Sequence, residues 1–476
     1  MPRYFVTLIV AVALFMETMD STVIATSLPA IARDLGEDPI ALKLALTSYL
    51  LSLAVFIPLS GWAADRFGAR SVFRAAIVVF TLGSAACGFA HSLFDFVLFR
   101  ILQGIGGAMM VPVGRLVILR TVPKVELISA LAWLTIPALM GPVIGPPLGG
   151  FITTFTSWRW IFWINIPIGI LGVILATYYI QNFREEVPPP LDVKGFILSG
   201  IGLSGLAFGF TTIGQGLFPP VIVASLLAAG VIGCLLYVRH ARTAAAPLLD
   251  LRLLKIDTFF ASVAGGFIFR VGIGATPFLL PLLLQLGFGL TPFQSGMLTF
   301  STAVGAIAMK TTAAPILRRF GFKQVLVVNA VLSAFFIAIP ALFTPITPHG
   351  LILVVLLVGG FFKSLQFTSI QTLAYADIEP RAMSAATSFA SVAQQLSMSA
   401  GVAVGALVLE IQRHGRADMV VQSSDFTTAF VVVGLISAAS AFIFLRMPRS
   451  AGASLSAPVR PLPKAQEQVT EASVDI

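Results

Sequence analysis

Charged residues are scarce in this chain of 476 residues: Asp, Glu, Lys and Arg make up 11% of it, whereas soluble domains contain about a quarter. Hydrophobic residues make up 57%, and the mean hydropathy is +0.95. This balance excludes a soluble globular protein. It predicts an all-α polytopic membrane protein, with the lipid bilayer as its main surrounding.

Cysteine is also nearly absent. Cys87 and Cys234 both fall inside apolar runs, so we predict neither a disulfide framework nor a metal site. No Gly-x-x-x-x-Gly-Lys-Ser/Thr loop occurs, which argues against ATP as the energy source, and we expect no cofactor. The net charge is +9, but the basic residues are spread through short loops, so we expect no nucleic-acid partner.

Long apolar runs dominate the sequence instead, and a helix needs about 20 apolar residues to cross a bilayer. The run next to the N-terminus is too long for the core of a signal peptide and contains Glu17 and Asp20. We therefore interpret it as a retained span. Fourteen spans are predicted, at residues 4–28, 44–64, 73–92, 96–119, 129–153, 158–181, 195–214, 220–239, 258–286, 294–314, 324–343, 350–374, 385–410 and 426–446.

A short charged turn separates the second and third spans. Its charges cannot remain in hydrocarbon, so the chain must reach the membrane surface here. Its glycine at position 68 allows a tight reversal. The turn is a candidate conformational motif, formed by Gly61, Asp65, Arg66, Gly68 and Arg70.

The turn has a weaker copy at residues 318–323, where Gly321 lies 253 residues after Gly68 (321 − 68). Six spans end near Arg184, so this repeat leaves room for two more spans of about 20 residues each between two six-span halves. Such parallel halves are a known transporter plan. We predict an N-terminal six-helix bundle at 1–184, a linker with two extra transmembrane helices at 185–256, a C-terminal six-helix bundle at 257–447 and a disordered tail at 448–476.

The loop charges predict the orientation. With the N-terminus in the cytoplasm, roughly 20 of the 30 Lys and Arg lie on cytoplasmic segments and roughly 5 lie outside. The reverse orientation would invert this bias. We therefore expect both termini and both arginine-containing turns in the cytoplasm, and the protein in the plasma (inner) membrane.

Ionisable side chains within spans are costly and mark candidate functional sites. Glu17 and Asp20 share one face of the first helix. Arg100 in the fourth span comes to a similar depth as Asp20, roughly 6–8 Å from the outer edge of the apolar layer. A buried carboxylate beside an arginine can take up a proton when the pair separates, so these three are candidate proton-coupling residues. The alternative is a permanently ionised structural pair.

The fifth span combines glycine and proline. Glycines four residues apart let neighbouring helices pack closely, and prolines break the hydrogen-bond ladder and kink a helix. Close packing alone or a conformational hinge would each explain this second candidate motif, formed by Gly141, Gly145, Pro146, Gly149 and Gly150.

Other polar residues within spans are candidates for lining a substrate cavity. They are Gln103, Arg270, Lys363, Gln366, Gln394 and Gln395. Arg115 and Lys310 also fall within spans, but near predicted cytoplasmic ends, where we expect their long side chains to reach the membrane surface.

The repeat also suggests a pairing. Adding 253 to Glu17 gives Arg270, so these two residues would occupy corresponding positions at equal depth in the first helix of each half. We hypothesise that they pair across a central cavity in one state and separate in another. The alternative is that Glu17 pairs with Arg100, while Arg270 is hydrated or binds an anionic substrate.

These motifs resemble those of the major facilitator superfamily, in particular its fourteen-span drug/proton antiporters of the EmrB/QacA type and their MdtD-like group. The resemblance implies that Arg100 takes part in proton transfer and that the fifth-span motif favours export over uptake. Ala25 and Ala69 depart from residues that are usual in the family. The likeness covers nearly the whole chain except the tail and rests on residues 20–29, 61–70, 100–108, 141–150, 158–169 and 191–195.

Three functions remain open. The first is a proton-coupled antiporter that exports drugs or other amphipathic compounds by alternating access, with small-molecule substrates and protons as partners. The second is a proton-coupled transporter of a specific, anionic metabolite, which Arg270 and Lys363 motivate. The third is a sensor or assembly subunit that does not transport, and no sequence feature supports it. The sequence does not decide whether a periplasmic adaptor is needed, and no enzymatic activity is expected.

Overall fold

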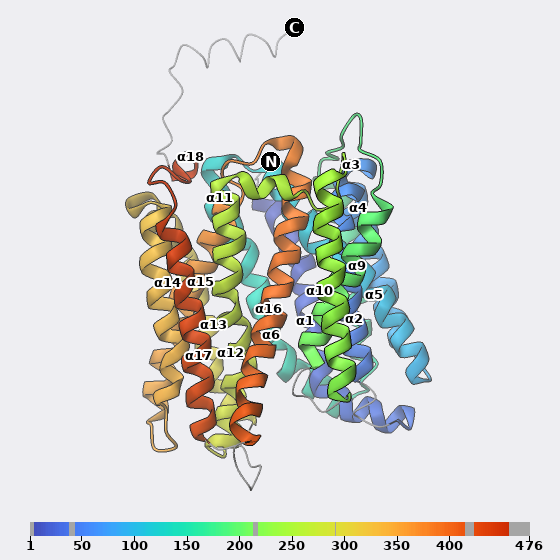
Figure 1. The fold of residues 1–476 in the computed structure, drawn as a ribbon. Helices are drawn as coiled ribbons and strands as arrows, with labels where there is room; N and C mark the ends of the chain where they lie inside the picture. The colour runs from blue at the N-terminus through green and yellow to red at the C-terminus, as the bar shows by residue number, and fades with distance from the viewer. Residues whose placement is uncertain (1–3, 38–42, 213–217, 291, 415–422, 457–476) are drawn as a thin grey trace.

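The computed structural model describes residues 4–37, 43–212, 218–290, 292–414 and 423–456. These ranges are helical and contain no strand. The long helices form one upright bundle (Figure 1). In chain order, the α-helices of the described residues are α1 (Tyr4–Leu35), α2 (Lys43–Phe56), α3 (Leu59–Phe67), α4 (Ala69–Cys87), α5 (Leu93–Thr121), α6 (Leu127–Phe155), α7 (Trp160–Trp163), α8 (Asn165–Tyr179), α9 (Val193–Thr212), α10 (Pro220–Thr243), α11 (Asp257–Phe260), α12 (Gly266–Leu282), α13 (Pro292–Phe320), α14 (Phe322–Ala338), α15 (His349–Leu373), α16 (Met383–His414), α17 (Ser423–Leu445) and α18 (Ala453–Ser456).

Twelve helical segments of the described chain are long and apolar enough to cross a membrane. A thirteenth span comes from α2 and α3, which bend by 59° where Pro58 interrupts the helix. Helix α6 has 29 residues and no charged side chain, but several of its side chains lie outside the described residues. The polytopic all-α class is therefore confirmed. The count of fourteen spans stays a prediction, in which α6 would be the fourteenth span.

The same helix pairs pack in each half of the chain. In the first half α1 packs on α6, α2 on α5 and α4 on α8. In the second half α12 packs on α16, α13 on α15 and α14 on α17. The first helix of one half, α1, thus corresponds to the first helix of the other, α12. Glu17 and Arg270 lie on these two corresponding helices.

The two predicted glycine turns have the same backbone. Gly68 has φ 90° and precedes α4, and Gly321 has φ 75° and precedes α14. A side chain at either position would be strained at these angles. A Cβ on Gly68 would also collide with the side chain of Asn182. The prediction of a tight reversal at both glycines is confirmed.

The two helices between the halves pack on each other through glycine. A Cβ on Gly205 would lie 2.8 Å from the Cα atom of Gly230, so neither residue leaves room for a side chain. Helix α9 also contacts α2 of the first half and α16 of the second half. Asp192 accepts hydrogen bonds from the N–H of Gly195, at the start of α9, and contacts His240 of α10 at 2.8 Å. The extra pair therefore lies along one side of the line where the halves meet.

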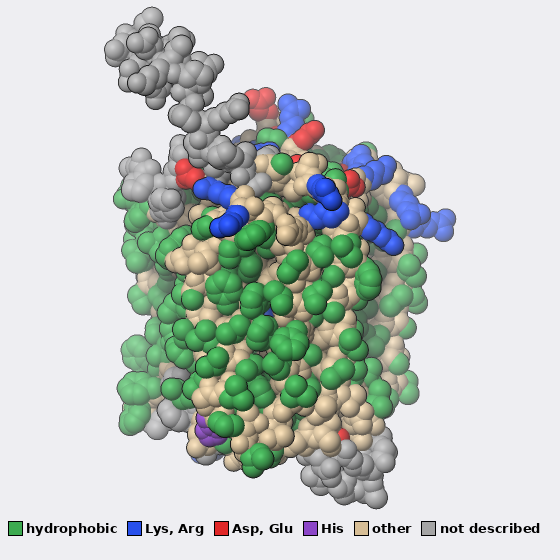
Figure 2. Space-filling model, turned by 90° about the vertical axis from the view of Figure 1, so that its left-hand side faces the viewer, with side chains coloured by type: hydrophobic (Ala, Val, Ile, Leu, Met, Phe, Trp, Pro, Cys, Tyr) green, Lys and Arg blue, Asp and Glu red, His purple; other side chains and the backbone are tan. Residues whose placement is uncertain are grey.

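Basic side chains gather at one end of the molecule, above a broad band of hydrophobic side chains (Figure 2). We call this the basic end; it carries the turns at residues 65–70 and 318–323. The hydrophobic band has the character of a lipid-facing surface. The positive-inside rule predicts that the basic end faces the cytoplasm.

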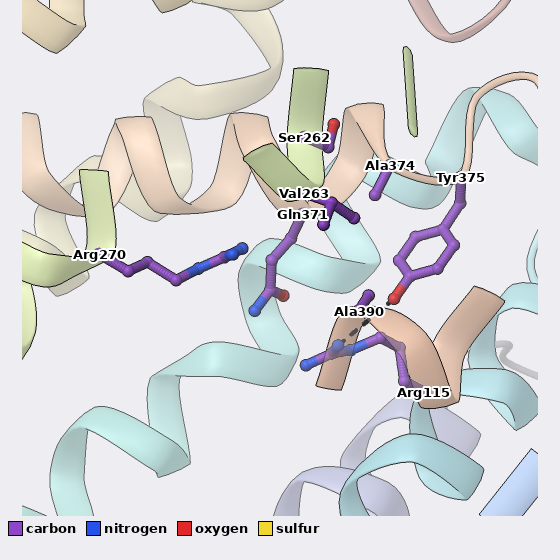
Figure 3. Close-up of a pocket in the computed structure, with 8 residues that line it drawn as sticks. All are labelled: Arg115, Ser262, Val263, Arg270, Gln371, Ala374, Tyr375 and Ala390. Atoms are coloured by element: carbon purple, nitrogen blue, oxygen red, sulfur yellow. Dashed lines mark hydrogen bonds between the residues drawn. The ribbon is translucent and has the colours of Figure 1, made fainter. Parts of the chain in front are cut away.

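The two halves touch at the basic end. Figure 3 shows Arg115 of α5 reaching across to Tyr375 of the second half. Hydrogen bonds between described residues of the two halves lie near this end. They include those from the Gly61 N–H to Ser388 Oγ at 2.8 Å, from Ser384 Oγ to Asp65 at 2.5 Å, from Arg115 Nη1 to the Tyr375 hydroxyl at 3.3 Å and from Lys124 Nζ to the Ala376 carbonyl at 3.2 Å. The pathway between the halves is closed here.

The start of the tail differs from the prediction of disorder from residue 448. The described chain continues through α18, and Ala451 and Leu455 are buried. The chain at Gly452 lies against Phe322 and Leu373. These few apolar contacts order the segment, which the high content of Pro, Ser and Gly in the tail concealed. Residues 457–476 lie outside the described chain.

Candidate functional site

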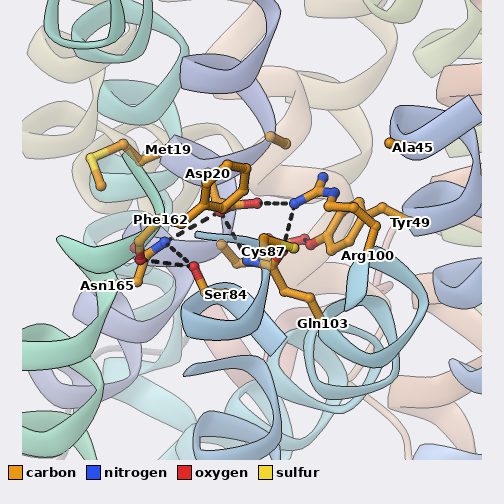
Figure 4. A network of polar contacts seen from close by, with 12 residues as sticks. Met19, Asp20, Ala45, Tyr49, Ser84, Cys87, Arg100, Gln103, Phe162 and Asn165 are labelled. Atoms are coloured by element: carbon orange, nitrogen blue, oxygen red, sulfur yellow. Dashed lines mark hydrogen bonds and ion pairs between the residues drawn. The ribbon is translucent and has the colours of Figure 1, made fainter. Parts of the chain in front are cut away.

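A buried ionic network joins four helices of the first half (Figure 4). Arg100 Nη1 lies 2.6 Å from Asp20 Oδ2, and the two side chains are each only 1% exposed. Gln103 Nε2 and Asn165 Nδ2 donate to Asp20 Oδ1 at 2.9 and 3.2 Å. All these partners are donors, so both side-chain oxygens of Asp20 act as acceptors here.

Small residues bring these side chains together. A Cβ on Gly83 of α4 would lie 2.6 Å from the backbone nitrogen of Gln103, and one on Gly106 of α5 would collide with the backbone at Phe80. Helices α4 and α5 therefore approach closely, as the glycine-rich sequence after Arg100 favours. Ser84 then accepts from Asn165 at 3.0 Å and donates to the Phe162 carbonyl at 2.9 Å. This second layer fixes the amide that faces Asp20.

The similar depths of Asp20 and Arg100 are confirmed by their contact. Glu17, by contrast, has another partner than the two arginines considered from the sequence. Glu17 accepts a hydrogen bond from the Tyr49 hydroxyl at 3.1 Å, and the guanidinium of Arg100 lies over the Tyr49 ring at 4.3 Å. In this conformation Glu17 is bonded to neither Arg100 nor Arg270. Pairing of Glu17 with Arg270 in another state stays a prediction.

Arg270 is buried on α12 and lies at a small cavity between the halves. Its guanidinium makes no hydrogen bond or ion pair with any described residue and lies 5.4 Å from the centre of the Phe367 ring. Arg115 lines the same cavity. We expected Arg115 to reach the membrane surface, and this was wrong: it is buried and turned inward onto Tyr375 and Gln394.

The other cavity candidates occupy different places. Gln103 belongs to the Asp20 network. Gln366 is buried within the second half, where it accepts from Asn329 at 3.0 Å and donates to the Leu326 carbonyl at 3.0 Å. Gln394 bridges Arg115 and Gln371 between the halves. Gln395 is half-buried on the same helix, α16.

Two lysines lie in the second half. Lys363 is buried on α15 and has no hydrogen-bond partner among the described residues. Lys310 on α13 was expected to reach the membrane surface, but it is buried and donates to Thr368 Oγ1 at 2.9 Å. The sequence prediction failed because it used only distance from the span end, whereas the direction of the side chain depends on the helix face.

The glycine motif of α6 packs against α1. A Cβ on Gly141 would lie 2.9 Å from the backbone nitrogen of Met19, and one on Gly145 would collide with Thr22. Thr22 Oγ1 also donates to the Gly141 carbonyl at 3.1 Å. By contrast, a Cβ on Gly150 would meet nothing within 4 Å. Gly149 is buried on α6, and the side chain of Pro146 lies outside the described residues.

The motif of the charged turn lies at the contact between halves. Gly61 permits the approach of α16, because a Cβ there would lie 2.7 Å from the Ser384 carbonyl. Asp65 accepts from Ser384, while Arg66 is exposed and Arg70 half-buried. This motif therefore acts at the closed basic end.

Sequence reasoning missed several members of these networks. Asn165 and Tyr49 hold Asp20 and Glu17, and Gln371 and Tyr375 line the cavity with Arg115. Asn165 carried a usable signal, since it is an amide within an otherwise apolar run. Tyr and Gln at helix ends are common and gave no such signal.

Two repeated six-helix halves, a buried ionic network and a closed contact at one end define a membrane transport protein with a pathway between its halves. The chain belongs to the Major Facilitator Superfamily, whose family model matches residues 10–238 and 262–472. It is 38% identical over 444 residues to "Putative multidrug resistance protein MdtD" of Escherichia coli (strain K12), covering 92% of this chain and 94% of that protein.

Solved structures with the same fold share little sequence. The human organic anion transporter MFSD10 (TETRAN) has a TM-score of 0.67 at 15% identity, and covers 93% of this chain and 100% of its own. The proton:xylose symporter XylE has a TM-score of 0.66 at 14% identity, and the match covers 94% of this chain and 97% of that chain. The family and the multi-pass membrane class predicted from the sequence are thus confirmed.

Proposed function

We propose that this protein is a proton-coupled antiporter of the plasma (inner) membrane that exports amphipathic small molecules by alternating access. The observation that carries the proposal is the buried Asp20 carboxylate, which is held by Arg100, Gln103 and Asn165. A buried ion pair is weak evidence for stability alone, because desolvation offsets much of the attraction. A proton-binding role gives this costly arrangement a reason.

The chemistry of coupling follows from the donors around Asp20. A proton on Asp20 cancels its charge, so the attraction to Arg100 falls and Arg100 needs another partner. Gln103 Oε1 already accepts from Arg100 Nη1 at 2.6 Å, and the Tyr49 ring lies beneath the guanidinium. Arg100 can therefore shift toward Gln103 and Tyr49 without losing every contact. Protonation would in this way loosen α1 from α5.

Alternating access requires that the basic end can open. The contacts between halves there are single hydrogen bonds. The neutral bond of Gly61 to Ser388 contributes about 1 kcal/mol, and those of Arg115, Lys124 and Asp65 contribute about 1.5–3 kcal/mol each. A few such bonds can break within a transport cycle. The pH gradient would supply the energy, and no cofactor is invoked.

A second candidate is a transporter of a specific anionic metabolite. Arg270 and Lys363 favour it, because both are buried without an acidic partner among the described residues. This candidate shares the fold and the proton site and differs in the substrate. The direction of transport rests on the predicted cytoplasmic position of the basic end.

The experiment is transport in proteoliposomes with an imposed pH gradient, comparing the wild type with Asp20→Asn. We expect the variant to lose accumulation driven by the gradient, while exchange of substrate without a gradient continues. Full gradient-driven accumulation by Asp20→Asn would refute proton coupling at this residue.

Asp34→Asn is the matched control. Asp34 lies on the same helix, and Arg159 bonds to it at 2.6 Å, so it forms an equally short ion pair outside the apolar span. The hydrogen bond from Arg159 holds the pKa of Asp34 below its ordinary value of 3.8, so this carboxylate stays ionised throughout the assay. We expect Asp34→Asn to keep gradient-driven transport.

A further inference from the structure

A small cavity lies between the two halves near the basic end (Figure 3). Arg115 of α5 and Arg270 of α12 reach it from opposite halves. Its other polar neighbours are Ser262, Gln371 and Tyr375. In this closed conformation it offers about the space of one water molecule. The cavity thus collects two cationic side chains at the point where the halves meet.

Neither arginine has an acidic partner in the described structure. Arg270 has no hydrogen-bond partner there at all, and Arg115 bonds only to the neutral Tyr375 and Gln394. The Nε atoms of both arginines and the hydroxyl of Ser262 are buried without partners. Several donors therefore converge on the cavity, and the acceptor buried there without a partner, Gln371 Oε1, is neutral and does not balance the two positive charges.

This arrangement is unfavourable for an empty site. A buried charge without a partner costs several kcal/mol, and the two guanidinium groups also repel each other. Arg100, another buried arginine of the first half, shows the usual remedy, because it has Asp20 at 2.6 Å. Helices α12 to α15 offer no such remedy, since no Asp or Glu occurs from residue 258 to residue 376. In this conformation an anion from outside the protein would supply the missing negative charge.

We propose that Arg115 and Arg270 bind the anionic group of the transported substrate, a carboxylate, sulfonate or phosphate, on the side where the substrate enters. Two guanidinium groups offer forked, charge-assisted hydrogen bonds that match such a group. Phe367 and Tyr375 lie beside them and suit an attached apolar or aromatic body. The anion binds when the basic end is open, because the closed cavity is too small for it. This inference rests on the proposed transport function and narrows its substrate class to amphipathic anions.

The test uses the full-length purified protein and a panel of matched aromatic probes. Each set contains an acid, its amide and its amine on the same ring system, beginning with 2-naphthoic acid, 2-naphthamide and 2-naphthylmethylamine. Binding is measured by thermal shift and transport in proteoliposomes. We expect the acids to bind and to be transported, while the amides and amines do so at least tenfold more weakly.

Variants locate the site. Arg270→Gln should weaken binding of the acids at least tenfold and leave the weak binding of the amides unchanged, and Arg270→Lys should lie between Arg270→Gln and the wild type. Arg115→Gln should act in the same direction. Arg239→Gln is the control, because Arg239 is an exposed arginine in the last turns of α10. This variant should bind the acids as the wild type does.

The outcomes separate this inference from the proposed function. Transport of the amines by a pH gradient, with the acids inactive, would leave the proton-coupled exporter standing and overturn the anion site. Acids that bind through Arg270 but are not driven by the gradient would support the anion site and refute proton coupling. Binding of inorganic phosphate alone, or no binding of any acid, would overturn the assignment of a substrate to this site.

Discussion

Two buried arginines, Arg100 in the first half and Arg270 in the second, have opposite surroundings. Arg100 has a carboxylate, an amide and an aromatic ring within contact distance. Arg270 has only the edge of a cavity and a ring at 5.4 Å. The first arrangement suits a proton that arrives and leaves, and the second suits an anion that does so. In the proposed function, the proton site lies in the first half, and the anion site takes one arginine from each half.

The geometry of Arg100 leads to a prediction for Arg100→Lys. One nitrogen, Nη1, donates to both Asp20 and Gln103 at 2.6 Å, while the planar group lies over Tyr49. Lysine keeps the charge but has neither the planar fork nor the same reach. We expect gradient-driven transport to fall about tenfold, which corresponds to about 1.4 kcal/mol, without complete loss.

The control for this variant is Arg159→Lys. Arg159 also pairs with an aspartate at 2.6 Å and lies over a tryptophan ring, but it is at the water-exposed end of the bundle. Exposed ion pairs contribute little, so we expect normal transport. Equal rates for Arg100→Lys and the wild type would show that only the charge of Arg100 matters.

At the scale of helices, the contact of α6 with α1 depends on two particular glycines. The backbone of α1 at Met19 and the side chain of Thr22 fill the space that a Cβ on Gly141 or Gly145 would need. Asp20 lies between these two contacts along α1. We therefore expect movement of α6 to be transmitted to the helix that carries the proposed proton site.

We expect Gly141→Leu and Gly145→Leu to reduce transport by more than tenfold, because a leucine at either position forces α6 away from α1. Gly150→Leu is the control on the same helix, since its Cβ would meet no atom within 4 Å. Transport by each variant is measured per folded molecule, with the folded fraction taken from size-exclusion chromatography. Similar rates for Gly145→Leu and Gly150→Leu would contradict a role of this contact in the cycle.

These helices also show what could be predicted from the sequence. The lengths of the apolar runs located the spans. Two glycines in similar charged turns, Gly68 and Gly321, revealed the repeat. Depth along the helix correctly matched Asp20 to Arg100. The direction of a side chain around the helix axis was not predictable, because these spans are apolar on nearly every face. For that reason Arg115 and Lys310 were expected at the membrane surface, and Gln103 was expected at the substrate cavity instead of beside Asp20.

At the scale of the whole molecule, the direction of export depends on which side of the membrane the basic end faces. Contacts between halves close that end, and the proposed anion site lies just inside it. If the basic end is cytoplasmic, a substrate enters past Arg115 and Arg270 before it reaches the depth of Asp20. If it were periplasmic, the same residues would serve uptake. The orientation in the membrane therefore decides whether the proposed transport is export or uptake.

Reporter fusions that are active only in the periplasm test this orientation. The loop charges predict that fusions after Arg184 and after Arg242 are silent, and that a fusion after Gly216 is active. Residue 216 lies in the connection between α9 and α10, outside the described residues, so this fusion also tests whether the extra pair crosses the membrane. Activity at Arg184 and Arg242 with silence at Gly216 would invert the orientation and turn the proposed exporter into an importer. Silence at all three sites would mean that α9 and α10 do not span the bilayer, although their lengths of 20 and 24 residues are sufficient.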